Sequence, residues 1–151
     1  MARSRGARGF SVPELMIVLA MLGIVAAIAY PSFTDALRKG RRSEGMQALA
    51  LVQQGEERFR SSNATYGDST NFASWGVTAT TSSGYYSIAV GGVSATGYTA
   101  TATAVAGTSQ ANDTNCTVLG VRMAGGNLSY GGGASIDWTA ANPDPNRCWA
   151  R

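Results

Sequence analysis

The sequence contains no histidine among its 151 residues. It therefore lacks the side chain that most often serves as a general base and as a metal ligand. Its two cysteines cannot by themselves complete a structural zinc site. The acidic residues beyond residue 61 stand at no catalytic spacing; they are Asp68, Asp113, Asp137 and Asp144. We therefore predict no catalytic residue, no cofactor and no bound metal, and we do not expect an enzyme.

Two polar segments near the C-terminus are predicted to be turns. The glycines at 131–133 lack the lysine and the strand-to-helix setting of a phosphate-binding loop, so we interpret them as a flexible turn. A later segment offers oxygen atoms of the kind that Ca²⁺ prefers, from Asp137, Asn142, Asp144 and Asn146. Such side chains more often bond to their own backbone in turns, so we do not predict a calcium site.

Charged residues make up only 14% of the chain, and the positive excess is confined to its beginning. Arg3, Arg5 and Arg8 lie within the first nine residues, and the rest of the chain has nine basic and nine acidic side chains. Nucleic-acid binding requires a basic patch. The charge pattern therefore disfavours nucleic acid as a partner, although it leaves that alternative open.

One long apolar run is present, and it predicts a transmembrane helix. Residues 15–34 include no charged side chain, and these 20 residues match the length that a helix needs to cross a bilayer. An ordinary secretory signal peptide would have a shorter apolar core followed by a small-residue cleavage site. This run instead continues into a helical pattern, which favours an anchored chain.

The residues just before this run carry the most specific signal. An arginine-rich leader ends at Gly9, Phe10 follows, and Glu14 stands at the edge of the apolar run, where an unpaired carboxylate is costly. The segment from Gly9 to Glu14 resembles the processing motif of type IV prepilins. The resemblance implies cleavage between Gly9 and Phe10 by a prepilin peptidase and methylation of the new Phe10 amine. It also implies that Glu14 neutralises the N-terminal amine of a neighbouring subunit and so sets the register of assembly.

Pro13 departs from the usual motif, but its position fits a helix that begins at Phe10. The first four N–H groups of a helix have no partner within it. A proline at the fourth position therefore forfeits little, whereas inside an uncut helix it would cost about 3 kcal/mol.

Further along the run, Gly23 and Pro31 are also placed as in pilins. The resemblance implies that the helix can unwind between them in an assembled filament. Pro31 removes a helical hydrogen bond, so we predict a kink there in any case. The basic cluster that follows is interpreted as contacting lipid headgroups or neighbouring stems; it comprises Arg38, Lys39, Arg41 and Arg42.

The predicted fold class is α+β, a type IV pilin fold with a long N-terminal helix packed on a small antiparallel sheet. The helix is expected to continue to about residue 60 with an apolar stripe of Ala48, Leu51, Val52, Gly55 and Phe59. Strands are predicted at 85–90, 98–105 and 117–123, with a weaker one at 127–130 and an irregular C-terminal region after it.

Cys116 and Cys148 are predicted to form a disulfide, because the N-terminus indicates an exported chain. In the chain-entropy model such a bond would contribute about 3–4 kcal/mol. Together these patterns divide the chain into a leader (1–9), a transmembrane and assembly helix (10–34), an amphipathic stem (35–61) and a globular head (62–151).

The sequence as a whole resembles a structural subunit, most like the small PilE-like minor pilins. The resemblance implies partners in other pilin subunits, the prepilin peptidase and an assembly platform in the inner membrane. It implies an inner-membrane precursor with the head outside the cytoplasm, and a filament after assembly. Alternatives are a pseudopilin of a type II secretion system and a DNA-binding or adhesive tip pilin; a membrane-anchored enzyme has the least support.

Overall fold

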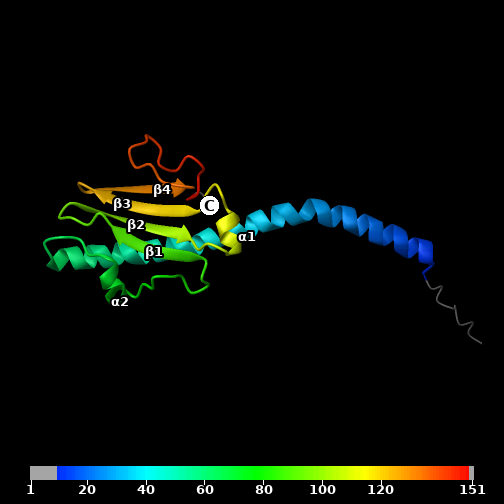
Figure 1. Cartoon of the computed structure of the whole chain (residues 1–151), viewed down its shortest axis with the longest axis horizontal. Coiled ribbons are helices and arrows are strands. Elements are labelled where there is room, and N and C mark those ends of the chain that lie inside the picture. The colour runs from blue at the N-terminus through cyan, green and yellow to red at the C-terminus, as the bar shows by residue number, and fades with distance from the viewer. Residues whose placement is uncertain (1–9, 150–151) are drawn as a thin grey trace, which may run out of the picture. The chain divides into compact units, whose positions relative to one another are not determined.

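The computed structural model describes residues 10–149, and within this range the chain forms one long helix, three short helices and one sheet (Figure 1). In chain order the elements are α1 (Val12–Ser62), η1 (Ser69–Asn71), α2 (Phe72–Trp75), β1 (Tyr86–Gly91), β2 (Gly97–Ala104), η2 (Ser109–Asn112), β3 (Val118–Ala124) and β4 (Asn127–Gly133). The chain divides into two compact units, Met1–Ala36 and Leu37–Arg151, which are described separately below.

In the first unit, the described residues are almost entirely helical. Helix α1 begins at Val12, two residues after the Phe10 start that the motif suggested, and Pro13 lies in its first turn. The helix is long and apolar enough to cross a membrane. Because aliphatic and methionine side chains recur without interruption, no single face of this stretch is polar.

The second unit holds a four-stranded antiparallel sheet in the order β1-β2-β3-β4. The register pairs Ile88 with Ala102, Ala102 with Leu119, and Leu119 with Gly132. Between β3 and β4, Gly125 and Gly126 have φ values of 55° and 84°, which glycine adopts without strain in a two-residue hairpin. Successive strands therefore pair with their chain neighbours, and β1 and β4 form the two edges (Figure 1).

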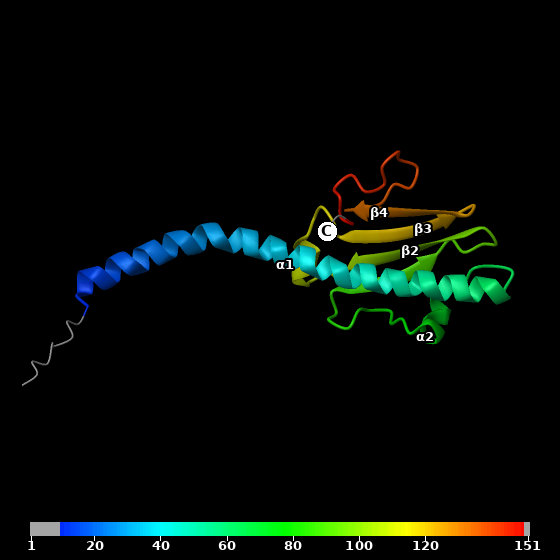
Figure 2. The same cartoon turned by 180° about the vertical axis from the view of Figure 1, so that it is seen from behind.

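The core of this unit lies between the sheet and the second half of α1, which runs in front of the sheet in Figure 2. A Cβ built on Gly45 would lie 3.3 Å from Leu119 Cδ1 and 3.3 Å from Tyr86 Cγ, so helix and sheet are in close contact. Leu49 and Val52 are fully buried one and two turns later. This packing confirms the predicted α+β architecture of a helix on an antiparallel sheet.

A second contact fixes the segment after α1. Trp75 of α2 packs on the helix where Gly55 provides space, since a Cβ on Gly55 would lie 2.5 Å from Trp75 Cδ2. Phe59 and Phe72 place their rings 6.2 Å and 6.0 Å from the Trp75 ring. The aromatic cluster therefore holds the connection between helix and sheet against the end of α1.

Two of the sequence predictions need correction. The buried stripe of α1 is Gly45, Leu49, Val52, Gly55 and Glu56, whereas Leu51 is 43% exposed. The glycines at 131–133 are not a flexible turn, because β4 continues through Gly133. A Cβ on Gly132 would lie 2.5 Å from Cys148 Cβ, so glycine is needed there for close packing within a strand.

Candidate assembly site

The apolar half of α1 presents an uncovered apolar surface. Its large side chains, together with that of Phe10 just before the helix, are between 46% and 81% exposed; they are Phe10, Val12, Leu15, Met16, Ile17, Val18, Leu19, Met21, Leu22, Ile24, Val25, Ile28, Tyr30 and Phe33. A soluble monomer rarely exposes so large a contiguous apolar area. This surface therefore requires lipid or other protein chains as its surroundings.

At the start of this helix, the predicted assembly residues lie close together along the chain. Phe10 is 81% exposed and precedes the helix, and Glu14 lies in its first turn. A carboxylate in this turn interacts favourably with the unpaired N–H groups of the helix end. Gly9 lies outside the described residues. Cleavage at Gly9, methylation of Phe10 and the register role of Glu14 therefore stay predictions.

The Gly23–Pro31 segment is helical in the structure. Helix α1 is assigned without interruption through Pro31. The hydroxyls of Ser32 and Thr34 donate to the carbonyls of Ala29 and Pro31, at 3.0 and 2.8 Å. A Cβ on Gly23 would meet no other group within 4 Å. Unwinding between Gly23 and Pro31 in a filament stays a prediction about the assembled state.

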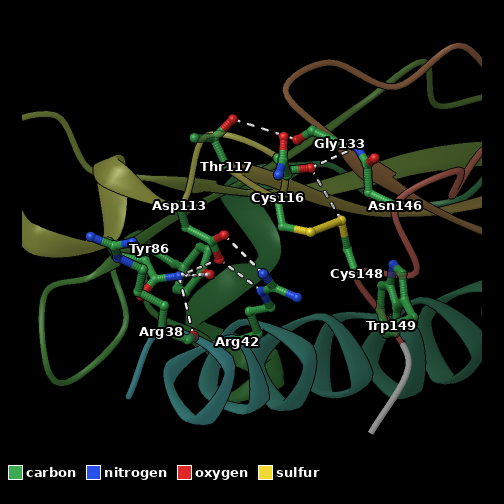
Figure 3. Close-up of polar contacts among 12 residues, drawn as sticks. Arg38, Arg42, Tyr86, Asp113, Cys116, Thr117, Gly133, Asn146, Cys148 and Trp149 are labelled. Carbon is green, nitrogen blue, oxygen red and sulfur yellow. Dashed lines mark hydrogen bonds and ion pairs between the residues drawn. A yellow bond between two sulfur atoms is a disulfide. The ribbon is translucent and has the colours of Figure 1, made fainter. Parts of the chain in front are cut away.

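A buried polar cluster fixes the head to the stem helix (Figure 3). Arg42 of α1 donates two hydrogen bonds to Asp113, from Nε to Oδ2 at 2.7 Å and from Nη2 to Oδ1 at 2.8 Å. The Gln110 amide donates to Asp113 Oδ2 at 3.1 Å and to the Tyr86 hydroxyl at 2.9 Å. The bond to Asp113 raises the pKa of Arg42, and burial raises the pKa of Tyr86 to about 12. The cluster is therefore a charged, bidentate clamp between helix and sheet.

This clamp corrects part of the interpretation of the basic cluster. Arg42 was expected to face lipid headgroups or neighbouring stems, but its side chain is only 12% exposed and binds Asp113. Arg41 lies over the Tyr85 ring, 4.2 Å from its centroid. No local pattern indicates the Arg42–Asp113 contact, because Asp113 is 71 residues away from Arg42.

A disulfide fixes the C-terminal segment to the sheet. Cys116 and Cys148 are bonded with their Cα atoms 5.5 Å apart, which confirms the predicted pair. Asp144 Oδ1 accepts the Cys148 N–H at 2.7 Å. Asn146 donates to the Asn115 carbonyl at 3.0 Å (Figure 3). Asp137, Asn142 and Asp144 accept hydrogen bonds from backbone N–H groups two to four residues further on, as predicted for turns, for example from Thr139 N to Asp137 Oδ1 at 2.8 Å.

One buried acid was missed by the sequence prediction. Glu56 lies on the core side of α1 and is 0% exposed. Its Oε2 accepts the Gly67 N–H at 2.8 Å, while Oε1 has no partner among the described residues. Burial raises its pKa to about 7, although the Gly67 bond opposes the shift. The only available signal was its spacing of four residues from Val52, which places both on the same helix face.

Comparison with known families agrees with this arrangement. The profile of the type IV minor pilin ComP, DNA uptake sequence receptor, matches residues 31–120, and the prokaryotic N-terminal methylation motif matches residues 4–30. The chain belongs to the ComP family of type IV minor pilins. The matched methylation motif and the long apolar helix are consistent with a membrane-anchored precursor.

Individual relatives carry the same kind of name. The chain is 39% identical over 64 residues to the type IV major pilin protein PilA of Myxococcus xanthus (strain DK1622), covering 42% of this chain and 29% of that protein. It is 46% identical over 48 residues to the fimbrial protein EcpC of Eikenella corrodens, covering 32% and 31% of the two chains. It is 44% identical over 39 residues to a type IV major fimbrial protein FimA of Dichelobacter nodosus, covering 26% and 24%. The similarity therefore spans less than a third of each of these relatives.

Proposed function

We propose that this pilin is a structural subunit, with no catalytic activity, of a type IV pilus. The observation that carries the proposal is the exposed apolar half of α1, which needs a bilayer before assembly and neighbouring helices after it. The matched methylation motif at 4–30 supports the same role. The head would then remain outside the cytoplasm while the helix packs in the filament.

Processing and assembly would use the residues at the start of α1. A prepilin peptidase would cut between Gly9 and Phe10, and the Phe10 amine would be methylated. An inner-membrane assembly platform would then extract the subunit. In the filament, Glu14 would pair with the Phe10 amine of a neighbour, since each charge is costly when left alone in an apolar surrounding. This pair would set the axial position of each subunit.

A test replaces Glu14 with Gln and measures incorporation into sheared filaments by quantitative peptide mass spectrometry. The matched control is Glu57→Gln, which removes the same charge from an exposed position on the same helix. We expect Glu14→Gln to leave the membrane precursor level unchanged and to reduce incorporation strongly, with Glu57→Gln at the wild-type level. Equal incorporation of the two variants would contradict the role of Glu14 in setting the register of assembly. If both variants were found only in a secretion pseudopilus, the type II secretion alternative would be favoured.

A second candidate function is DNA binding, because the matched family profile is named for a DNA uptake sequence receptor. The head would bind duplex DNA through phosphate contacts, and binding would weaken steeply as salt rises. Electrophoretic mobility shift of a labelled duplex by the full chain in detergent tests this. A shift that fades between low and physiological salt supports DNA binding, whereas no shift at low salt contradicts it.

A further inference from the structure

The two edges of the sheet differ in how their backbone groups are bonded. At the β1 edge, the chain itself occupies the outward N–H groups: Ile88 donates to the Ala79 carbonyl at 2.8 Å, and Val90 donates to the Ser69 hydroxyl at 3.0 Å. An edge covered in this way is not available to another strand. The β1 edge is therefore closed.

The β4 edge is closed only at its end. Gly132 donates outward to the Pro143 carbonyl at 3.0 Å. Along an antiparallel strand, the backbone N–H and C=O groups of every second residue point away from the neighbouring strand. Those of Leu128 and Tyr130 therefore point outward from the sheet, as those of Gly132 do. Neither residue has a backbone partner on that side among residues 10–149. The first half of β4 therefore presents two open donors and two open acceptors at a two-residue repeat.

A groove lies between β4 and helix α1 beside this open edge. Its volume is about 820 Å³, which is within the range of ligand-binding clefts. Its walls combine apolar and aromatic side chains with amide, hydroxyl and basic ones; they comprise Lys39, Arg42, Ser43, Met46, Gln47, Ala50, Gln53, Val121, Tyr130, Cys148 and Trp149. Tyr130 is 45% exposed and packs edge-on against Trp149, with ring centroids 4.8 Å apart. The side chains of an added strand would therefore have an apolar and aromatic surface to contact.

The length and charge of the groove further define its occupant. The α1 wall runs from Lys39 to Gln53, which is about 21 Å at the helical rise per residue and matches about six residues of extended chain. Arg42 at this end is already paired with Asp113. Lys39 has no ion-pair partner in the described part of the chain, so its charge is available to a carboxylate.

We propose that β4 and this groove bind an extended, acidic peptide segment of a partner protein. The segment adds as a fifth strand on Leu128 and Tyr130, inserts alternate side chains into the groove, and places a carboxylate at Lys39. Only an extended polypeptide presents donors and acceptors at the two-residue repeat of this edge. Self-pairing of the same edge requires two-fold symmetry, which subunits of a helical filament do not have. The exclusion of self-pairing rests on the pilus role proposed above, whereas the open edge and the groove do not.

The first test concerns the edge itself and uses amide hydrogen exchange on the full chain in detergent. Without ligand, the amides of Leu128 and Tyr130 should exchange fast and those of Ile88 and Val90 slowly. Slow exchange of Leu128 and Tyr130 that grows with protein concentration would overturn the proposal, because a second copy would then occupy the edge. Slow exchange at every concentration would overturn it too, because the edge would be closed within the chain.

The second test adds a synthetic peptide of alternating threonine and valine that ends in two aspartates. We expect it to slow exchange at Leu128 and Tyr130, and we expect an analogue N-methylated at every second residue to have no effect. Lys39→Met should weaken binding about two- to fivefold, as for an exposed ion pair, while Arg122→Met on the opposite face of the sheet should not. Leu128→Pro should abolish binding, because proline removes an outward N–H group that the added strand would use. The sheet itself does not use this N–H group, so the fold should tolerate the change.

Either of two results would overturn the proposal. The first is equal binding of the N-methylated and unmodified peptides, which would exclude strand addition. The second is a bound peptide that leaves exchange at Leu128 and Tyr130 unchanged, which would place it elsewhere on the protein. Because the N-methylated peptide acts on the unmutated chain, this conclusion holds even where Leu128→Pro does not fold.

Discussion

The buried carboxyl of Glu56 makes the stability of the head depend on pH, and Glu56→Gln should remove that dependence. The group is 0% exposed, and its pKa in the folded chain is about 7 against an ordinary value of 4.5. The folded state therefore holds the proton more tightly than the unfolded state, and stability falls as the pH rises from about 4.5 to about 7. Above this window Glu56 is ionised and the penalty is complete.

The size of the effect follows from the pKa difference. A shift of one unit corresponds to about 1.4 kcal/mol, so ionised Glu56 costs the fold about 3 kcal/mol at pH 8. Gln keeps an oxygen that accepts the Gly67 N–H and carries no charge. We therefore expect Glu56→Gln to be more stable than wild type by up to about 3 kcal/mol at pH 8 and nearly equal to it at pH 4.

Urea unfolding of the full chain in detergent measures this, with tryptophan fluorescence as the probe, because Trp75, one of the three tryptophans, packs directly on the neighbouring Gly55. Free energies of unfolding are compared from pH 4 to pH 8. Glu57→Gln is the matched control, since the adjacent acid is exposed and its charge adds less to the raised pKa of Glu56 than burial does, so most of the pH slope should remain. If wild type and Glu56→Gln had the same pH slope, or if Glu56→Gln were less stable at pH 8, ionisation of Glu56 would not be the cause of the pH dependence.

Three further substitutions test the packing of the head. Asp113→Asn should destabilise the head by about 3 kcal/mol in urea unfolding, because the substitution leaves the Arg42 charge buried without its partner. An additional Arg42→Met should recover part of this loss of stability. Cys148→Ser should cost about 3–4 kcal/mol, and wild type treated with a reductant should lose the same amount; a smaller loss in both would contradict the loop-closure estimate. Gly55→Ala should cost about 1–3 kcal/mol and alter the tryptophan fluorescence of the folded state, because a methyl group has no space beside the indole; an unchanged spectrum would argue against that contact.

The elements with regular local patterns could be predicted from the sequence. The uninterrupted apolar run predicted the N-terminal helix, and strand-like runs between glycine-rich turns predicted all four strands to within a few residues. The disulfide followed from the inferred export of the chain and from the presence of only two cysteines. In each case the signal lies within a short window or in the composition.

The features that sequence reasoning missed depend on distant contacts. Leu49 rather than Leu51 faces the core, because the position of the sheet, and not the apolar pattern alone, selects the buried side of an amphipathic helix. Gly132 looked like part of a turn, yet it is a strand residue whose missing side chain admits Cys148. The Arg42–Asp113 clamp joins residues far apart in the chain, so no local pattern could have indicated it.

Whether this chain is a processed pilin can be tested by intact-mass and N-terminal peptide mass spectrometry on the unreduced protein from its native membrane. We expect a chain that begins at N-methylated Phe10 and is two hydrogen atoms lighter than its reduced form, as the Cys116–Cys148 bond requires. A chain that begins at Met1, or one cut near Tyr30, would contradict it.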